Sequence, residues 1–136
     1  MMTPNPFIHT NTTGGGPLAC SAAIAAIRIT LRDRLWEQAA AKGEYVFPKL
    51  RQLANRYPKI YTDITGKGLL IGQHFHTPQI GYRVAAGLFK RGVLVSGNLT
   101  NARTVRIEPP LVIRYDQLDE VINRLQDAVA EVDKTL

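Results

Sequence analysis

The sequence predicts an α/β fold, in which a small and mostly antiparallel sheet is covered by helices on one side. The first observation is the amphipathic pattern of residues 116–132, which is the most regular helical period in the chain. The second is a pair of short runs, residues 60–65 and 69–75, that alternate polar and apolar side chains on either side of Gly66 and Gly68. At 136 residues the chain suits one domain, which buries roughly two-thirds of its unfolded surface.

The N-terminal part is expected to form an extended segment, a turn and a first helix. Pro4 and Pro6 oppose a helix near the start of the chain. After Gly16 a helix is predicted as far as about Thr30, with small side chains on nearly all of its sides. Such a helix suits close packing against two neighbours.

A second helix is expected to begin at Asp33, whose side chain suits the N-cap, and to reach about Tyr57. Pro48 lies inside its apolar stripe. Because proline removes one helical hydrogen bond, we expect a kink or a break at that residue.

The second half of the chain alternates strands and helices. After the two strands named above, the predicted elements are a helix from Pro78 to Gly92, a strand over 93–96, a polar hairpin-like segment over 97–101, a strand over 104–108 and a helix from Asp116. Pro109 and Pro110 end the last strand because they have no N–H group to donate.

Composition excludes some classes of function. The net charge is +6, but the basic residues are spread along the chain and no basic run is interleaved with aromatic residues, so nucleic-acid binding is not favoured. Cys20 is the single cysteine, which rules out an intrachain disulfide and fits a reducing, cytoplasmic compartment. Its small apolar neighbours indicate a packed thiol rather than a nucleophile. No apolar run suits a membrane span, and no secretory leader is recognised.

Residues 9–20 form a polar, glycine-rich turn that leads into the alanine-rich first helix. The glycines leave backbone N–H groups uncovered, and the hydroxyls of Thr10, Thr12 and Thr13 adjoin the positive end of a helix dipole. This arrangement is suited to binding an anion such as phosphate. The spacing matches neither the P-loop nor the dinucleotide-binding motif, so a simple helix cap is the alternative interpretation.

Three motifs in the same order resemble class III (ornithine-type) pyridoxal-phosphate-dependent aminotransferases. They are His-Thr-x-Thr with Gly-Gly-x-Pro-Leu-Ala-Cys at residues 9–20, Gly-x-Gly-Leu at 66–69 and Arg-x-x-Pro-Pro-Leu at 106–111. The stretch over 97–111 is similar to putrescine aminotransferases in particular. The resemblance covers nearly the whole chain and implies the C-terminal portion of a longer enzyme of fold type I.

The resemblance also implies how the chain is divided. Residues 1–16 would be an extended segment with a turn that contacts phosphate, 17–32 an interdomain helix and 33–136 the C-terminal small domain. In the family, the second threonine of the first motif reaches across a subunit boundary to the phosphate of pyridoxal 5′-phosphate. This role falls to Thr12, with backbone help from Thr13, and it implies a homodimeric parent.

The arginine of Arg-x-x-Pro-Pro-Leu binds the substrate α-carboxylate in the family, and Arg106 matches it. A planar guanidinium suits this task because it offers two parallel charge-assisted donors. Without the motif, an ordinary surface ion pair would be the favoured interpretation of Arg106, and the motif reverses that preference. The chain departs from the family pattern where Thr13 stands for a common aromatic residue and Gly16 for an asparagine.

The resemblance implies amino-group transfer from putrescine or a related diamine or ω-amino acid to 2-oxoglutarate. The family's Schiff-base lysine lies upstream of the first motif, and Lys67 lacks the apolar surroundings that activate an amine. We therefore expect no catalytic residue in this chain, no activity from it alone and weak cofactor binding at most. Its partners would be a missing large domain or a second subunit. The alternative interpretation is a stand-alone interaction domain that associates with a full-length homologue.

His74 and His76 alternate at the end of a predicted strand, as a pair of metal ligands would. No third ligand lies nearby in sequence, and His9 is distant. The sequence therefore predicts no metal site.

Overall fold

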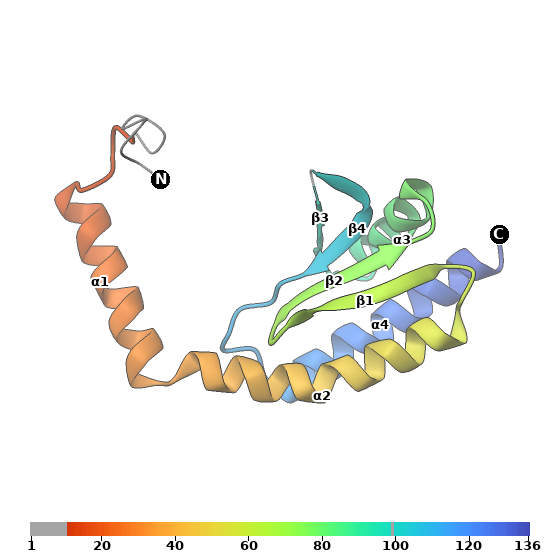
Figure 1. Ribbon diagram of the computed structural model, residues 1–136, viewed down its shortest axis with the longest axis horizontal. Helices are drawn as coiled ribbons and strands as arrows, with labels where there is room; N and C mark the ends of the chain where they lie inside the picture. Colours follow the sequence, from red (N-terminus) through yellow and green to blue (C-terminus); the bar gives the residue numbers. More distant parts are fainter. Residues whose placement is uncertain (1–10, 99) are drawn as a thin grey trace. The chain divides into compact units, whose positions relative to one another are not determined.

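The structure is a computed structural model that describes residues 11–98 and 100–136. The chain divides into two compact units, Met1–Arg34 and Leu35–Leu136. The first unit contains α1 (Pro17–Arg32). The second contains α2 (Leu35–Arg56), β1 (Tyr61–Lys67), β2 (Leu70–Phe75), α3 (Pro78–Lys90), β3 (Ser96–Asn98), β4 (Asn101–Ile107) and α4 (Tyr115–Asp133) (Figure 1). None of the helices in the described ranges has the length and apolar character needed to cross a bilayer.

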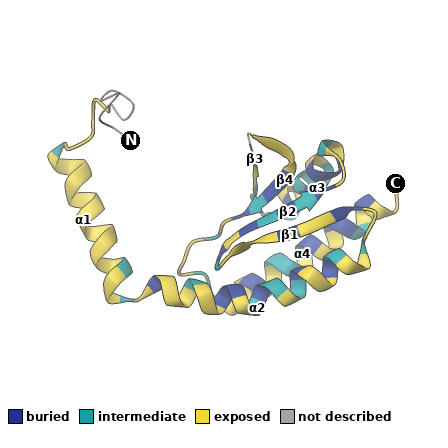
Figure 2. Ribbon diagram, viewed as in Figure 1, coloured by how far each residue is buried: buried dark blue, intermediate teal, exposed yellow. Residues whose placement is uncertain are grey.

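The predicted first helix is present as α1, which starts at Pro17, where a missing N–H group and a fixed φ are tolerated. None of its residues is buried (Figure 2). Its exposed large apolar side chains are Leu18, Ile24, Ile27, Ile29 and Leu31. Cys20 is exposed as well, so the expectation of a packed thiol is wrong. Small side chains permit close packing, but burial also needs a neighbouring element.

The predicted break at Pro48 is absent, because α2 continues through this residue as one helix. Val46 and Leu50, on either side of the proline, are buried in the core, and this packing offsets the hydrogen bond that proline removes. The helix begins at Leu35 instead of directly after Asp33. Arg34 has a φ of 49°, which lies outside the helical region.

The sheet has four antiparallel strands in the order β1-β2-β4-β3. The hairpin between β1 and β2 turns at the predicted glycines: Gly66 has a φ of 140°, and a Cβ there would lie 2.1 Å from the carbonyl oxygen of Leu70. The β3–β4 reversal is tighter than predicted, because the Asn98 side chain accepts hydrogen bonds from the backbone N–H and the hydroxyl of Thr100. β3 starts later than the sequence suggested, at Ser96, and β4 starts earlier, at Asn101.

The core of the second unit lies between one face of the sheet and the three helices α2, α3 and α4 (Figures 1 and 2). Alternate β2 residues, such as Ile71 and Phe75, are buried in it. The helices contribute Val46, Leu50 and Leu53 from α2, Ile80, Val84 and Leu88 from α3, and Leu118, Leu125, Ala128, Val129 and Val132 from α4. This arrangement confirms the predicted α/β class, with helices on one side of a small antiparallel sheet.

Candidate functional site

The glycine-rich turn in the first unit is organised by the side chain of Asn11. Its Oδ1 atom accepts hydrogen bonds from the backbone N–H of Thr13 at 2.9 Å and of Gly14 at 3.2 Å, and from the Thr13 hydroxyl at 3.0 Å. This is the local bonding that asparagine uses to stabilise turns. Gly15, with a φ of 81°, then reverses the chain before α1 begins.

Thr12 and Thr13, the two predicted phosphate contacts, differ in the hydrogen-bond donors that they leave free for a ligand. Thr12 is exposed, and its hydroxyl has no hydrogen-bond partner among the described residues. Thr13 already donates both its backbone N–H and its hydroxyl to Asn11. The N-cap of α1, Gly16, provides no side-chain acceptor for the first N–H groups of the helix. The donors available at this turn are therefore the Thr12 hydroxyl and the helix N-terminus.

Arg106, the predicted carboxylate ligand, lies near the end of β4 in the second unit. It pairs with Gly72 of β2 on one side and with Ser96 of β3 on the other. Its neighbours Val105 and Ile107 are buried in the core, so the alternation of a strand places Arg106 on the opposite, open face. Gly72 has no side chain on that face, and a Cβ there would lie 3.3 Å from the hydroxyl oxygen of Thr65 and 3.4 Å from Nε2 of His74.

Two side chains hold the Arg106 guanidinium. One terminal nitrogen, Nη1, lies 3.1 Å from Oε1 of Glu108, and the other, Nη2, donates to the hydroxyl of Ser96 at 3.3 Å. The Nε atom is buried and has no partner in the described part of the chain. Because 41% of the arginine side chain is exposed, its terminal nitrogens are the part that a ligand from solution can reach.

Ser96 and Glu108 are the site residues that sequence reasoning missed. Glu108 follows Arg106 at a spacing of two residues, which in an extended chain puts both side chains on the same face. This spacing was the available signal for Glu108. Ser96 could be found only from the register of β3 against β4.

A row of polar side chains continues along the open face next to Arg106. His74 of β2 bridges two threonines: its Nε2 lies 2.7 Å from the hydroxyl oxygen of Thr65, and its Nδ1 lies 3.0 Å from that of Thr104. His76 pairs instead with the carbonyl oxygen of Pro58, at 3.0 Å. No group of metal-binding side chains is found among the described residues.

Three lysines of the second unit, Lys42, Lys49 and Lys67, differ in their exposure and their partners. Lys67 is exposed at the end of β1. Lys42 is buried and donates to the carbonyl oxygen of Leu111, 2.7 Å away, in the loop that follows Pro110. Lys49 forms an ion pair with Asp119.

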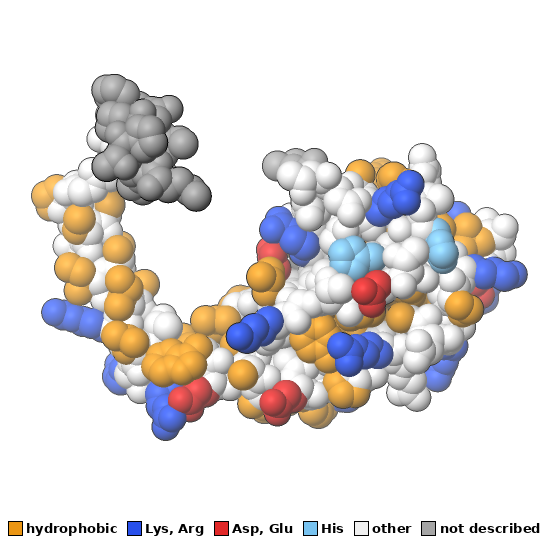
Figure 3. Space-filling model, viewed as in Figure 1, with side chains coloured by type: hydrophobic (Ala, Val, Ile, Leu, Met, Phe, Trp, Pro, Cys, Tyr) orange, Lys and Arg blue, Asp and Glu red, His pale blue; other side chains and the backbone are white. Residues whose placement is uncertain are grey.

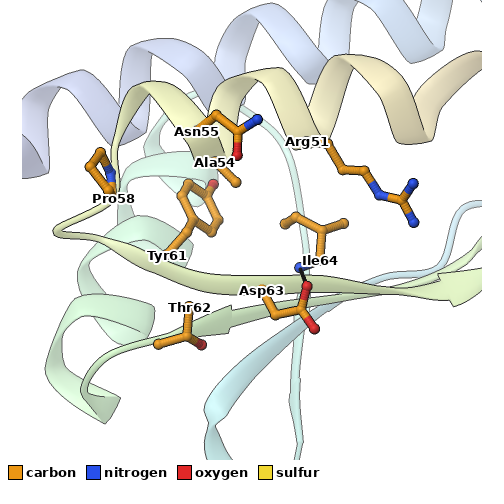
Figure 4. Close-up of a pocket in the computed structure, with 8 residues that line it drawn as sticks. All are labelled: Arg51, Ala54, Asn55, Pro58, Tyr61, Thr62, Asp63 and Ile64. Atoms are coloured by element: carbon orange, nitrogen blue, oxygen red, sulfur yellow. Dashed lines mark hydrogen bonds between the residues drawn. The ribbon is translucent and has the colours of Figure 1, made fainter.

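A recess of about 570 Å³ lies at the edge strand β1, beside the end of α2 (Figure 4). Its lining residues are Arg51, Ala54, Asn55, Pro58, Tyr61, Thr62, Asp63 and Ile64. The Asp63 carboxylate already accepts a hydrogen bond within the chain, from the backbone N–H of Ile64 at 2.7 Å. Neither Arg106 nor its partners line this recess.

On the one face of the second unit that Figure 3 draws, the basic side chains of the described residues do not gather into one patch. On the face of the second unit seen in Figure 3, lysine and arginine side chains are scattered among polar, acidic and apolar ones. Orange hydrophobic side chains are instead prominent along α1.

The family model of the class III aminotransferases matches residues 1–129. The chain belongs to the class III aminotransferase family. The family predicted from the three motifs is thereby confirmed.

This class III chain is similar to one part of several longer proteins of known structure. It is 28% identical to the ornithine aminotransferase from Toxoplasma gondii ME49, with a TM-score of 0.81, and the match covers 96% of this chain and 31% of that one. For the acetylornithine aminotransferase from Elizabethkingia anophelis the identity is 28% and the TM-score 0.80. That match covers 90% of this chain and 32% of the other. For the lysine aminotransferase from M. tuberculosis in the internal aldimine form, the identity is 27% and the TM-score 0.73. That match covers 79% of this chain and 24% of the other.

The class III chain thus spans about a third or less of the length of these proteins. The likeness confirms the remaining part of the predicted fold class, the C-terminal domain of a fold-type I transferase.

Proposed function

We propose that this chain is the part of a pyridoxal-phosphate-dependent aminotransferase that binds the substrate carboxylate and contributes one contact to the cofactor phosphate. The parent reaction is the transfer of an amino group from putrescine, or a related diamine or ω-amino acid, to 2-oxoglutarate. The observation that carries the proposal is Arg106, half exposed on the open face of the sheet within the family's Arg-x-x-Pro-Pro-Leu motif.

The carboxylate would bind to the terminal nitrogens of Arg106. Charge-assisted bonds from a guanidinium fork are shorter and stronger than neutral ones, and they fix the orientation of a carboxylate. Ser96 accepts a hydrogen bond from Nη2 and so holds the guanidinium in place. These residues therefore bind and orient the substrate, and they move no proton.

For the cofactor, the chain offers the exposed Thr12 hydroxyl and the uncapped N-terminus of α1, which fit a phosphate group. Thr13 supports the turn through Asn11, so its predicted backbone contribution would require this bond to open. Pyridoxal phosphate supplies the electron sink for amino transfer when it is bound. In the parent, residues 17–32 would connect the two domains, 33–136 would form the small domain, and a homodimer in the cytoplasm would complete the site.

We further propose that the chain alone is inactive. Of the lysines discussed above, Lys67 is exposed, Lys42 is bonded to a backbone carbonyl and Lys49 is paired with an acid, so none has the apolar, unpaired setting that activates an amine. The purified chain mixed with pyridoxal phosphate should give no visible absorbance band of a lysine-linked cofactor. A band that disappears in the Lys67→Ala variant would contradict the proposal.

The carboxylate site can be tested by titrating the ¹⁵N-labelled chain with glutarate, an unreactive analogue of the acceptor, and following arginine side-chain signals by NMR. We expect saturable shifts at Arg106 that the Arg106→Gln variant lacks. The matched control is Arg114→Gln, which removes another exposed arginine that is paired with an acid two residues away. Equal responses at Arg106 and Arg114 would contradict a dedicated site.

The second candidate function is an interaction domain that associates with a full-length homologue. It is favoured by α1, on which large apolar side chains are exposed and no residue is buried. Apolar surface of this extent commonly marks an interface. Light scattering distinguishes the candidates: a defined dimer that dissociates in the Ile27→Asp variant supports association through α1, and a monomer that binds no homologue argues against it.

A further inference from the structure

The recess between α2 and β1 plays no part in the proposed function. Its volume of about 570 Å³ falls within the range of small-molecule sites in proteins. Its lining combines apolar side chains that are partly or fully buried, Ala54 and Tyr61, with exposed charged ones, Arg51 and Asp63. Figure 4 shows the two charged residues toward one end of the recess and Pro58 at the other. This division suits a ligand with an apolar body and charged groups at one end.

A β-bulge coincides with the recess. In the pairing of β1 with β2, Tyr61 lies opposite Phe75. The next pair joins Asp63 to His74, so Thr62 is an extra residue without a partner in β2. Bulges redirect side chains and are frequent beside functional sites. Here the bulge falls among the residues of β1 that line the recess.

The two charged side chains of the recess are available to a ligand. Arg51 and Asp63 form no ion pair with each other, and neither has a partner of opposite charge among the described residues. The guanidinium carbon of Arg51 lies 5.7 Å from the centre of the Phe47 ring, a contact that uses none of its N–H donors. The Oδ1 atom of Asp63 accepts the hydrogen bond from Ile64, which orients the carboxylate and leaves Oδ2 for another donor.

We propose that this recess binds a small zwitterion, an α-amino acid with an apolar side chain. The carboxylate of the ligand binds Arg51, because a guanidinium offers parallel charge-assisted donors. The ammonium group donates to Asp63, and the side chain lies along Ala54 and the Tyr61 ring. A ligand with one charge would leave either the arginine or the aspartate opposed by a like charge or without a partner. The inference does not rest on the proposed function, since it concerns other residues.

The size of the effect follows from the exposure of the two charged residues. Exposed charge pairs are weak, and losing one changes an equilibrium constant by about two- to fivefold. Arg51→Gln and Asp63→Asn each remove one charge. Asparagine keeps an oxygen that can accept the hydrogen bond from Ile64, so the bulge should be retained.

The experiment uses the whole 136-residue chain, labelled with ¹⁵N, near neutral pH and at low ionic strength, where charge effects are least screened. The probe is L-phenylalanine. Two matched analogues are titrated separately: 3-phenylpropanoate, which lacks the ammonium group, and 2-phenylethylammonium, which lacks the carboxylate. The backbone amide signals of residues 61–64 report binding. The control variant is Arg56→Gln, which removes an exposed arginine of α2 that does not line the recess.

The two variants should weaken different ligands. In Arg51→Gln we expect L-phenylalanine and 3-phenylpropanoate to bind about two- to fivefold more weakly, and 2-phenylethylammonium to lose no affinity. In Asp63→Asn we expect the same loss for L-phenylalanine and 2-phenylethylammonium, and none for 3-phenylpropanoate. In Arg56→Gln all three affinities should equal those of the wild type.

This crossed pattern supports the inference. The absence of saturable shifts at residues 61–64 with L-phenylalanine overturns it. So does wild-type binding of 3-phenylpropanoate as tight as that of L-phenylalanine, because Asp63 would then not hold the ammonium group. Equal losses for all three ligands in either variant, or a loss in Arg56→Gln, also contradict the site. If one variant loses its folded spectrum, the selectivity of the other between the two analogues decides.

Discussion

Tyr61 and Gln73 form a buried polar pair inside the apolar core. The Tyr61 hydroxyl donates to Oε1 of Gln73 at 3.0 Å, and the Nε2 atom of Gln73 has no partner among the described residues. Burial raises the pKa of the Tyr61 hydroxyl well above its usual value, so it stays a neutral donor across the ordinary pH range. The pair therefore leaves one amide group unsatisfied in the folded state.

The buried Tyr61–Gln73 pair leads to a prediction about stability. Tyr61→Phe removes the one hydrogen bond of the Gln73 amide and should lower the free energy of unfolding by about 1–3 kcal/mol. Adding Gln73→Met removes the buried amide altogether, so the double variant should be more stable than Tyr61→Phe alone. Urea unfolding of the wild type, both single variants and the double variant measures the coupling. A double variant less stable than both single variants would contradict this account.

Asp119 leads to a prediction about pH. It accepts hydrogen bonds from Lys49 and, at 2.8 Å, from the Tyr45 hydroxyl, and these contacts lower the pKa of its carboxyl group. A lowered folded-state pKa stabilises the fold above the unfolded value of about 3.9, and this stabilisation is lost as the pH falls through the folded-state pKa. The advantage of the wild type over Asp119→Asn should therefore be constant near neutral pH and shrink below about pH 4.

Urea midpoints of both proteins from neutral to acidic pH provide the test. Comparison with Asp119→Asn is needed because Asp116 and Glu131 also have lowered pKa values, caused mainly by hydrogen bonds from Arg114 and Arg91, and they contribute to both curves. A difference between the two proteins that does not change with pH would show that the Asp119 charge is not involved.

The candidate site shows how far single residues can be inferred from sequence. The family resemblance proposed Arg106 and Thr12 as site residues, and in the structure both side chains are at least partly exposed. Their partners were not identified. Nothing in the sequence says that Asn11 occupies the donors of Thr13, or that Ser96 lies opposite Arg106, because such contacts depend on turn geometry and strand register.

At the level of elements, α2 and the β1–β2 hairpin meet through two glycines. A Cβ on Gly43 would lie 2.7 Å from both the Cα and the carbonyl oxygen of Gly68. These are backbone atoms, which cannot turn aside as a side chain would. Gly68 has a φ of 58°, which further restricts what can replace it.

Gly43→Ala should therefore destabilise the protein, although alanine is the better helix former by about 1 kcal/mol. The overlap forces α2 away from the hairpin, and we expect a loss of about 1–3 kcal/mol in the free energy of unfolding. The measurement is urea unfolding followed by circular dichroism. Gly97→Ala serves as control, because a Cβ at Gly97 meets no atom within 4 Å. A more stable Gly43→Ala variant would mean that helix propensity outweighs the contact.

The helices and strands themselves were largely predictable, because the periodicity of apolar residues and the presence of turn residues are local features of the sequence. The hairpin at Gly66 and Gly68 and the helices at Pro17 and Pro78 are found where the pattern put them. The predictions of elements failed where packing between residues distant in sequence determines the local structure. Pro48 does not break α2, since buried residues on both sides hold the helix together. Residues 93–95 lie outside β3, whose pairing with β4 runs only from Ser96 to Asn98.

At the scale of the whole molecule, the stable part of the chain should be the second unit. Every residue of the core cluster belongs to residues 46–132, whereas none of the residues of α1 is buried. The four strands and three helices of this unit enclose one apolar core. Stability and the proposed interactions of α1 therefore reside in different parts of the chain.

A truncated protein that consists of residues 35–136 should accordingly unfold at the same urea concentration as the full chain, within about 0.5 kcal/mol, because surface changes away from the core have small effects. It should also be more soluble, since it lacks the exposed leucines and isoleucines of α1. Removing residues 115–136 instead takes away Leu118, Leu125, Ala128, Val129 and Val132 and should abolish cooperative unfolding. A large loss of stability on removal of residues 1–34 would show that α1 packs against the second unit in solution, and the exposed helix would then be unavailable to a partner.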